Sequence, residues 1–218
     1  MMKILLVDDH AILRHGLRQI LSDSEGMEVT AEAENAEQAI RLVREQPFDV
    51  VVLDITLPDR NGLETLKILK REHPKLAVLI LTMHGEDEFG VRALKAGASG
   101  YLTKKSAPDQ LVNAVRMVAG GRKYIGPQLA EELAKSFGND SDQPPHETLS
   151  DREYQILCMI ASGTALSEMA AKLSISPKTV SVYRARIMAK MKFSNNAEMT
   201  HYAIKHQLVQ WAPKALTS

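Results

Sequence analysis

Acidic side chains follow two apolar segments of the chain and could together hold a divalent cation. Asp8 and Asp9 come directly after the apolar run Ile4–Val7, and Asp54 follows Val50–Leu53. Carboxylates that meet in a solvent-open crevice repel one another unless a cation lies among them, and Mg²⁺ prefers such oxygen ligands. Beside this cation, Asp54 could be the nucleophile of a phosphoryl transfer and become an aspartyl phosphate.

Two further polar groups follow apolar runs of the same kind. Thr82 comes after residues 78–81, and Lys104 comes shortly after residues 100–102. A hydroxyl and an ammonium beside a metal-bound carboxylate suit phosphoryl transfer, because cations neutralise charge on the transferred oxygens. Taken alone, Asp9 could instead cap the helix that we expect to begin just after it. Five such groups at the ends of apolar runs favour one common site.

Predicted strands and helices alternate along the first 120 residues, and these elements must position the polar groups. Short apolar runs predict strands, and the segments between them carry apolar residues at helical spacing. Such alternation predicts an α/β domain with a parallel sheet and helices on both faces, of the flavodoxin-like doubly wound kind. These sheets bear their functional groups beyond the carboxyl ends of the strands. The expected strands are Ile4–Val7, Met27–Ala31, Val50–Leu53, Val78–Leu81 and Gly100–Leu102.

The last third of the chain shows only helical signals. After an expected short helix at Pro127–Phe137, residues 138–146 hold a Pro pair and almost no apolar side chains, which indicates an exposed linker. Ser150 followed by Glu153 is a capping box, and Ser176 before Pro177 is a second helix start. We therefore predict a small all-α domain of about four helices.

The helix expected at residues 177–191 has two faces. Val180, Tyr183, Ile187 and Met191 follow helical spacing and should face the core, whereas small residues edged by cations should face outward. Together with a preceding helix near 167–173 and a turn at 174–176, this pattern predicts a helix-turn-helix that enters a DNA major groove. Without that context, a basic amphipathic helix is more often a solvated face. The candidate DNA contacts are Lys178, Thr179, Ser181, Val182, Arg184, Ala185, Arg186 and Lys190.

Composition agrees with a two-part protein. Residues 1–147 hold 18 Lys and Arg against 23 Asp and Glu, and residues 148–218 hold 9 against 4, so an acidic part precedes a basic one. A single cysteine, Cys158, suits a reducing compartment. No apolar run approaches the ~20 residues of a membrane helix, and the first residues do not resemble a signal peptide. We expect a cytoplasmic protein without a membrane partner.

Four motifs resemble the receiver domain of two-component response regulators, with the family's order and spacing over residues 3–120. They are Leu-Leu-Val-Asp-Asp-His (5–10), Val-Leu-Asp-Ile-Thr-Leu-Pro-Asp-Arg-Asn-Gly (52–62), Leu-Thr-Met (81–83) and Ala-Gly-Ala-Ser-Gly-Tyr-Leu-Thr-Lys (96–104). The resemblance implies that Asp54 accepts phosphate from a sensor histidine kinase. It implies a Mg²⁺ site formed by Asp8, Asp9, Asp54 and the backbone carbonyl of Thr56.

The same resemblance implies that Thr82 and Lys104 bind the phosphoryl oxygens and that Tyr101 is an aromatic switch. Two alternatives stay open. Lys105 stands at a position where many receivers have Pro, and this second lysine could take the role of Lys104. Tyr101 could serve only to pack the sheet.

Residues 147–211 resemble the LuxR-type DNA-binding domain of NarL/FixJ response regulators. The motifs that carry this resemblance are Leu149-Ser-Asp-Arg-Glu153, Gly163, Glu168-Met-Ala170, Leu173-Ser-Ile-Ser176 and Thr179-Val180. Ala165-Leu166 stands where Ser-Asn is common, and Ser181 and Tyr183 stand where Lys and His are common. Tyr183-Arg184 and the residues around His201 and His206 resemble the GacA and UvrY subgroup.

Together these resemblances imply a transcription regulator controlled by phosphorylation, with a homodimer as the active form, rather than an enzyme. The expected domains are a receiver at 1–120, a linker with a short helix at 121–146, and a DNA-binding domain at 147–218. One alternative is a phosphatase with an aspartyl-phosphate intermediate, but it needs a general acid where the chain has Thr56. Another is a module whose C-terminal helices bind a protein.

Overall fold

The computed structural model describes residues 1–137, 144–206 and 208–209, in two compact units, Met1–Gly138 and Asn139–Ser218. Most of the predicted linker (138–143) and the end of the chain (210–218) lie outside the described residues. Within the described ranges, no helix combines the length and the apolar character needed to cross a membrane.

The first unit contains a parallel sheet of five strands, as the sequence predicts. The strand order is β2-β1-β3-β4-β5, which is the order of flavodoxin-like doubly wound folds. Each expected strand is present, and most extend by one to a few residues. The strands are β1 (Met2–Val7), β2 (Met27–Ala33), β3 (Val50–Leu53), β4 (Ala77–Thr82) and β5 (Gly100–Thr103).

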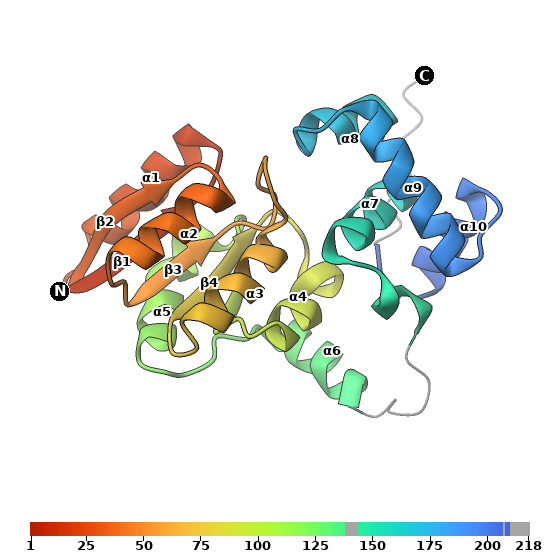
Figure 1. The fold of residues 1–218 in the computed structure, drawn as a ribbon. Coiled ribbons are helices and arrows are strands. Elements are labelled where there is room, and N and C mark those ends of the chain that lie inside the picture. The colour runs from red at the N-terminus through yellow and green to blue at the C-terminus, as the bar shows by residue number, and fades with distance from the viewer. Residues whose placement is uncertain (138–143, 207, 210–218) are drawn as a thin grey trace, which may run out of the picture. The chain divides into compact units, whose positions relative to one another are not determined.

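Helices cover both faces of this sheet (Figure 1). Leu17 and Leu111, from α1 and α5, pack with Ile4 and Leu6 on one face, while α2, α3 and α4 lie on the other. Since side chains alternate between the faces of a strand, fully covered strands must be apolar throughout, and β3 has four buried residues in succession. The helices are α1 (Ala11–Ser22), α2 (Ala36–Glu45), α3 (Gly62–Glu72), α4 (Glu86–Lys95), α5 (Ala107–Ala119) and α6 (Pro127–Phe137).

The segment after α5 belongs to the first unit. Tyr124 forms a parallel bridge with Gly100 at the outer edge of β5. Leu129 of α6 is fully buried, and its backbone N–H donates to the Glu86 carboxylate of α4 at 2.9 Å. The compact unit thus includes α6, which the sequence analysis assigned to the linker, and the exact domain boundaries stay a prediction.

The second unit is helical in its described part. A short 3₁₀ helix, η1 (Pro145–Thr148), precedes four α-helices. Ser150 and Glu153 form the predicted capping box, and the Ser176 hydroxyl accepts from the Thr179 N–H at 3.0 Å, so both predicted helix starts are confirmed. The α-helices are α7 (Asp151–Ala161), α8 (Leu166–Lys172), α9 (Pro177–Met191) and α10 (Asn196–Lys205).

Candidate functional site

The three predicted carboxylates meet at one edge of the sheet. β1 and β3 are neighbours, and Val7 lies opposite Leu53 in the register, so Asp8 and Asp54 leave the sheet side by side. Both side chains are buried, whereas Asp9 is exposed. Side-chain ligand atoms of Asp8, Asp9, His10 and Asp54 all lie within 4.8 Å of one another, so this set could hold a metal ion.

Lys104 reaches into the same place from the end of β5. Its Nζ lies 2.6 Å from Asp54 Oδ2 and 2.7 Å from Asp8 Oδ2, and all three side chains are nearly inaccessible to solvent. Lys105 is exposed, so the structure brings Lys104 and not its neighbour to Asp54. A buried cation between two buried carboxylates stabilises their charged forms.

The protonation states of Asp54 and Lys104 follow from their surroundings. Burial raises the pKa of the Asp54 carboxyl, although the attraction of Lys104 opposes the rise. Burial alone would lower the pKa of Lys104, but its ion pairs with Asp54 and Asp8 outweigh burial and raise it. Lys104 therefore stays an ammonium ion.

The other predicted groups lie close to Asp54 in the sequence or on the strands β4 and β5. The Thr56 N–H donates to Asp54 Oδ1 at 3.3 Å. Thr82 is fully buried at the end of β4, and its carbonyl accepts from the Lys104 N–H at 2.7 Å. The Tyr101 ring is also fully buried, and its hydroxyl lies 3.1 Å from the backbone carbonyl oxygens of both His84 and Gly85.

In the second unit, α9 presents the predicted exposed stripe. Lys178, Ser181, Val182 and Ala185 are exposed, and Thr179 is partly exposed. On the opposite side Val180, Ile187 and Met191 are buried as predicted, but Tyr183 is only partly buried. Tyr183 instead lies at the border of the two faces, where the Arg186 guanidinium lies over its ring, 5.7 Å from the ring centroid.

Two of the predicted DNA-contacting cations have partners within the unit. Lys190 Nζ lies 2.6 Å from Glu153 Oε2 of α7, and Arg184 Nε donates to Asn196 Oδ1 at 2.7 Å. Burial raises the pKa of the Glu153 carboxyl, but hydrogen bonds from Lys190 and Ser150 outweigh it and the pKa is lowered overall. These partners connect α9 with α7 and with the start of α10.

Comparison with known proteins finds a domain family for each unit and relatives that span the whole chain. Residues 4–116 match the response regulator receiver domain family, and residues 147–203 match the luxR family of bacterial regulatory proteins. The chain is 40% identical over 213 residues to Response regulator GacA of Pseudomonas aeruginosa, an alignment that covers 97% of this chain and 100% of that protein. The chain belongs to the response regulator family.

Two further matches agree with this assignment. The response regulator is 38% identical over 209 residues to Response regulator UvrY of Escherichia coli, with 95% of this chain and 96% of that one covered. It also resembles the structure of RcsB from Salmonella enterica serovar Typhimurium bound to the promoter rprA. That match has 27% identity and a TM-score of 0.61, and it covers 93% of this chain and 98% of that one. The resemblance to GacA and UvrY expected from the sequence is thus confirmed.

Several residues of the receiver site were not predicted from the sequence. The His10 ring lies against Asp9, with Nδ1 2.7 Å from Oδ1. Arg14 of α1 donates to the backbone carbonyl of Asp8 at 2.6 Å and pairs with Glu32 at 2.7 Å. Arg14 could have been noticed because it shares the inward stripe of α1 with Leu17, where a buried charge requires polar partners.

Gly62 is a second unpredicted feature of the site. A Cβ added to Gly62 would lie 2.0 Å from the backbone carbonyl oxygen of Asp54. The first turn of α3 therefore passes directly against the backbone of Asp54, and only glycine permits this approach. Asn61 fixes the same turn, because its side chain accepts from the Leu63 N–H at 2.8 Å.

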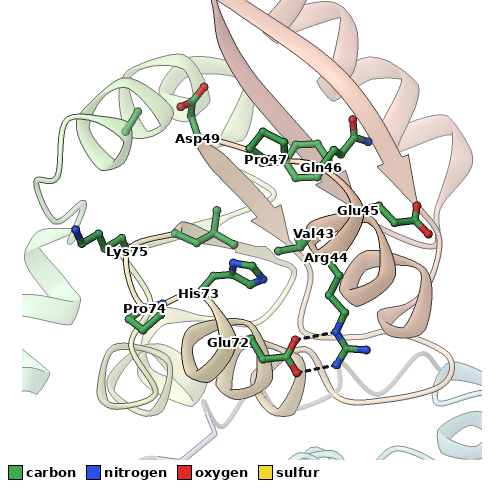
Figure 2. A pocket seen from close by; sticks show the side chains of 13 residues that line it. Val43, Arg44, Glu45, Gln46, Pro47, Asp49, Glu72, His73, Pro74 and Lys75 are labelled. Atoms are coloured by element: carbon green, nitrogen blue, oxygen red, sulfur yellow. Dashed lines mark hydrogen bonds and ion pairs between the residues drawn. The ribbon is translucent and has the colours of Figure 1, made fainter.

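A groove of about 800 Å³ lies away from these groups (Figure 2). Its lining comes largely from the segments that precede β3 and β4, at the opposite ends of the strands from Asp54. Arg44 and Glu72 form a bidentate ion pair there, with distances of 2.8 and 2.7 Å. Since this groove lies at the amino ends of the strands, it has no part in the carboxylate site.

Proposed function

We propose that Asp54 is the phosphoacceptor of this response regulator and receives its phosphoryl group from a sensor histidine kinase. The observation that carries this assignment is the position of its carboxylate, buried beside Asp8 and held 2.6 Å from the Lys104 ammonium. The expected cation is Mg²⁺, held by Asp8, Asp9, Asp54 and the backbone carbonyl of Thr56. These oxygen donors fit it, because the cation prefers carboxylate and carbonyl ligands.

In the transfer, a carboxylate oxygen of Asp54 forms a bond to phosphorus while the bond from phosphorus to the donor's leaving atom breaks. When bound, the cation neutralises charge on the phosphoryl oxygens. Lys104 exchanges its ion pairs with the carboxylates for one with a phosphoryl oxygen, and the Thr82 hydroxyl donates to another oxygen. The anionic form of Asp54 is the nucleophile, and Lys104 favours that form by its charge.

A labelling assay with a small phosphodonor tests this assignment. Acetyl phosphate with Mg²⁺ should add one phosphoryl group to the wild-type chain, as intact-mass spectrometry would record. Asp54→Asn should remain unmodified, while Asp59→Asn, at an acidic position that instead caps α2 through the Ala36 N–H at 2.9 Å, should still be labelled. Labelling of Asp54→Asn at the wild-type level contradicts the assignment.

We further propose that phosphorylation controls transcription through sequence-specific binding of α9 in the DNA major groove. This is supported by the exposed stripe of small residues on α9, by the match to the luxR family and by the DNA-bound state of the RcsB relative. We propose a homodimer as the active form. We propose the cytoplasm as the location of the protein, since DNA and a kinase's phosphodonor must both reach it. The proposed chemistry is limited to accepting and releasing phosphate, without enzyme activity on other molecules.

The exposed and the paired cations of α9 should differ in DNA binding. Removal of one cation from a DNA phosphate lowers the slope of log K against log salt by about one unit. Lys178→Ala and Arg186→Ala should show this change for operator and random DNA alike. Lys190→Ala should change the slope less, because its ammonium is already held by Glu153.

Substitutions in the exposed stripe should act on sequence preference instead. Changes at Ser181, Val182 or Ala185 should alter the preference between DNA sequences by about 1–3 kcal/mol and leave the salt slope nearly constant. Fluorescence anisotropy over a range of salt concentrations measures both quantities. If removal of Lys178 and Arg186 together leaves the slope unchanged, α9 does not bind the phosphates as proposed.

A further inference from the structure

Helix α6 is the last helix of the first unit, and a carboxylate from α4 caps it. At the start of α6, Gly126 has no side chain that could serve as a cap, and Pro127 has no N–H. The Glu86 carboxylate supplies the acceptor from outside the helix, because Oε2 accepts from the Leu129 N–H at 2.9 Å. Negative charge stabilises the N-terminus of a helix, so Glu86 performs from α4 the role of a capping residue of α6.

The two helices pack closely around this cap (Figure 1). Leu129 is fully buried, and a Cβ added to Gly90 of α4 would overlap its side chain. A Cβ added to Gly126 would lie 2.5 Å from Glu86 Oε1, so a larger residue there would displace the carboxylate. We call the contact of Glu86 with Gly126 and the Leu129 N–H the latch. It fixes the first turn of α6 on the first turn of α4.

The residues directly before Glu86 reach the phosphorylation site. The His84 N–H donates to the Thr82 hydroxyl at 3.5 Å, which is longer than an ordinary hydrogen bond. The Tyr101 hydroxyl lies 3.1 Å from the carbonyl oxygens of His84 and Gly85. The Thr82 hydroxyl is the group that we expect to bind a phosphoryl oxygen, and a small movement toward that oxygen breaks its long bond with His84. Such a change lies only two residues from the latch.

We propose that Glu86 holds α6 on α4 while Asp54 is unmodified and releases it when Asp54 carries a phosphoryl group. The inference rests on the proposed phosphorylation of Asp54 and adds the contact through which this modification reaches α6. It requires two arrangements of residues 82–86, of which only one places the carboxylate at the start of α6. Since the chain runs from α6 toward the second unit, release of α6 adds its residues to the connection between the units.

Beryllium fluoride with Mg²⁺ tests the latch on the full chain, since BeF₃⁻ is the phosphomimetic present in the RcsB structure. Hydrogen exchange measured by mass spectrometry follows the amides of α6, and calorimetry on the same sample measures binding of the mimic. In the wild type, the α6 amides should exchange about fivefold faster when the mimic is bound, the size expected for the loss of one helix cap.

Two variants remove the latch from its two sides. In Glu86→Ala, the α6 amides should already exchange about fivefold faster without the mimic, and the mimic should add little. This variant should also bind the mimic about fivefold more tightly, because binding no longer breaks the latch. Gly126→Ala should change both quantities in the same direction, since its Cβ displaces the carboxylate. Glu37→Ala is the matched control, because Glu37 is an exposed first-turn carboxylate of α2, and it should behave as wild type.

The affinity for the mimic separates a latch from a cap that only stabilises α6. If Glu86→Ala and Gly126→Ala speed the exchange of α6 but bind the mimic as wild type does, the carboxylate is a structural cap and the latch is refuted. It is also refuted if wild type binds the mimic and the exchange of α6 stays unchanged. If wild type does not bind the mimic at all, the proposed phosphorylation of Asp54 fails and the inference falls with it.

Discussion

Replacement of Lys104 by methionine removes one charge from the centre of the receiver site and keeps most of the side chain's length. In the wild type the ammonium lies 2.6 Å from Asp54 Oδ2 and 2.7 Å from Asp8 Oδ2. The side chains of all three residues are at most 4% exposed. Lys104→Met therefore leaves two buried carboxylates next to each other without the cation that lies between them.

The size of the effect follows from this geometry. Removal of one partner from a buried ion pair destabilises a protein by about 3–5 kcal/mol, because the remaining charge is buried without compensation. We expect the free energy of unfolding of the first unit to fall by that amount at about pH 7. Mg²⁺ should recover part of the loss, because a ligand that binds only the folded state stabilises it.

Urea unfolding followed by circular dichroism measures the change, and Lys105→Met is the matched control. Lys105 is the neighbouring lysine and is exposed, so its replacement should change the free energy of unfolding by less than about 0.5 kcal/mol. The double variant Lys104→Met/Asp54→Asn should regain much of the lost stability, because only one buried carboxylate remains. The reasoning is refuted if Lys104→Met is as stable as Lys105→Met, or if Asp54→Asn fails to restore it.

The loss caused by Lys104→Met should also depend on pH. Burial already raises the pKa of Asp54, and Lys104 limits that rise, so the variant's Asp54 has a still higher pKa in the folded state. The folded variant then binds a proton more readily than the unfolded chain does. Its deficit should be absent below the unfolded carboxyl pKa and complete above the raised folded pKa. Unfolding at a series of pH values checks this, and a deficit that grows as the pH falls contradicts it.

Two further substitutions, Gly62→Ala with Gly16→Ala as its control and Ser150→Ala, test residues that stabilise the two units. Gly62→Ala should destabilise the first unit by about 1–3 kcal/mol and slow phosphorylation, because its Cβ would lie 2.0 Å from the Asp54 carbonyl oxygen. Gly16→Ala, in α1 with no atom within 4 Å of the added Cβ, should be neutral or stabilising by up to ~1 kcal/mol in the same urea assay. Ser150→Ala should destabilise the second unit by about 1 kcal/mol through loss of the capping box. Since the pKa of Glu153 is lowered, the second unit loses stability as the pH falls from the ordinary carboxyl pKa through that lower value, and Ser150→Ala should reduce this loss.

The fold of the first unit and most of its site were predictable because buried parallel strands are apolar along their whole length. The sequence changes from apolar to polar residues where such a strand ends, as between Leu53 and Asp54. Strand order then follows from the doubly wound pattern, and it places Asp8 beside Asp54. A polar residue directly after an apolar run was therefore a reliable sign of a group at the carboxyl edge of the sheet.

Contacts between separate helices were not predictable in this way. Helical spacing shows that Lys190 borders the exposed face of α9, but it contains no information on which helix lies beside that border. Only the packing of α7 against α9 brings Glu153 within 2.6 Å of Lys190. The Arg184 bond to Asn196 likewise depends on how the chain turns after α9. Sequence periodicity identifies the face of a helix, whereas the partners of its long side chains require the tertiary structure.

The strand ends that bear the chemistry also anchor the segment that leads out of the receiver. Lys104 follows β5, and Tyr101 on the same strand places its hydroxyl against the carbonyl oxygens just before α4. The outer edge of β5 pairs with Tyr124, and Glu86 at the start of α4 accepts from the Leu129 N–H of α6. If Asp54 accepts a phosphoryl group as proposed, the change in the partner of Lys104 acts at the end of the strand that holds both α4 and the start of the exit segment. Because Lys104 directly follows the edge strand β5 rather than a central strand, it connects the charge of Asp54 with the residues that precede the second unit.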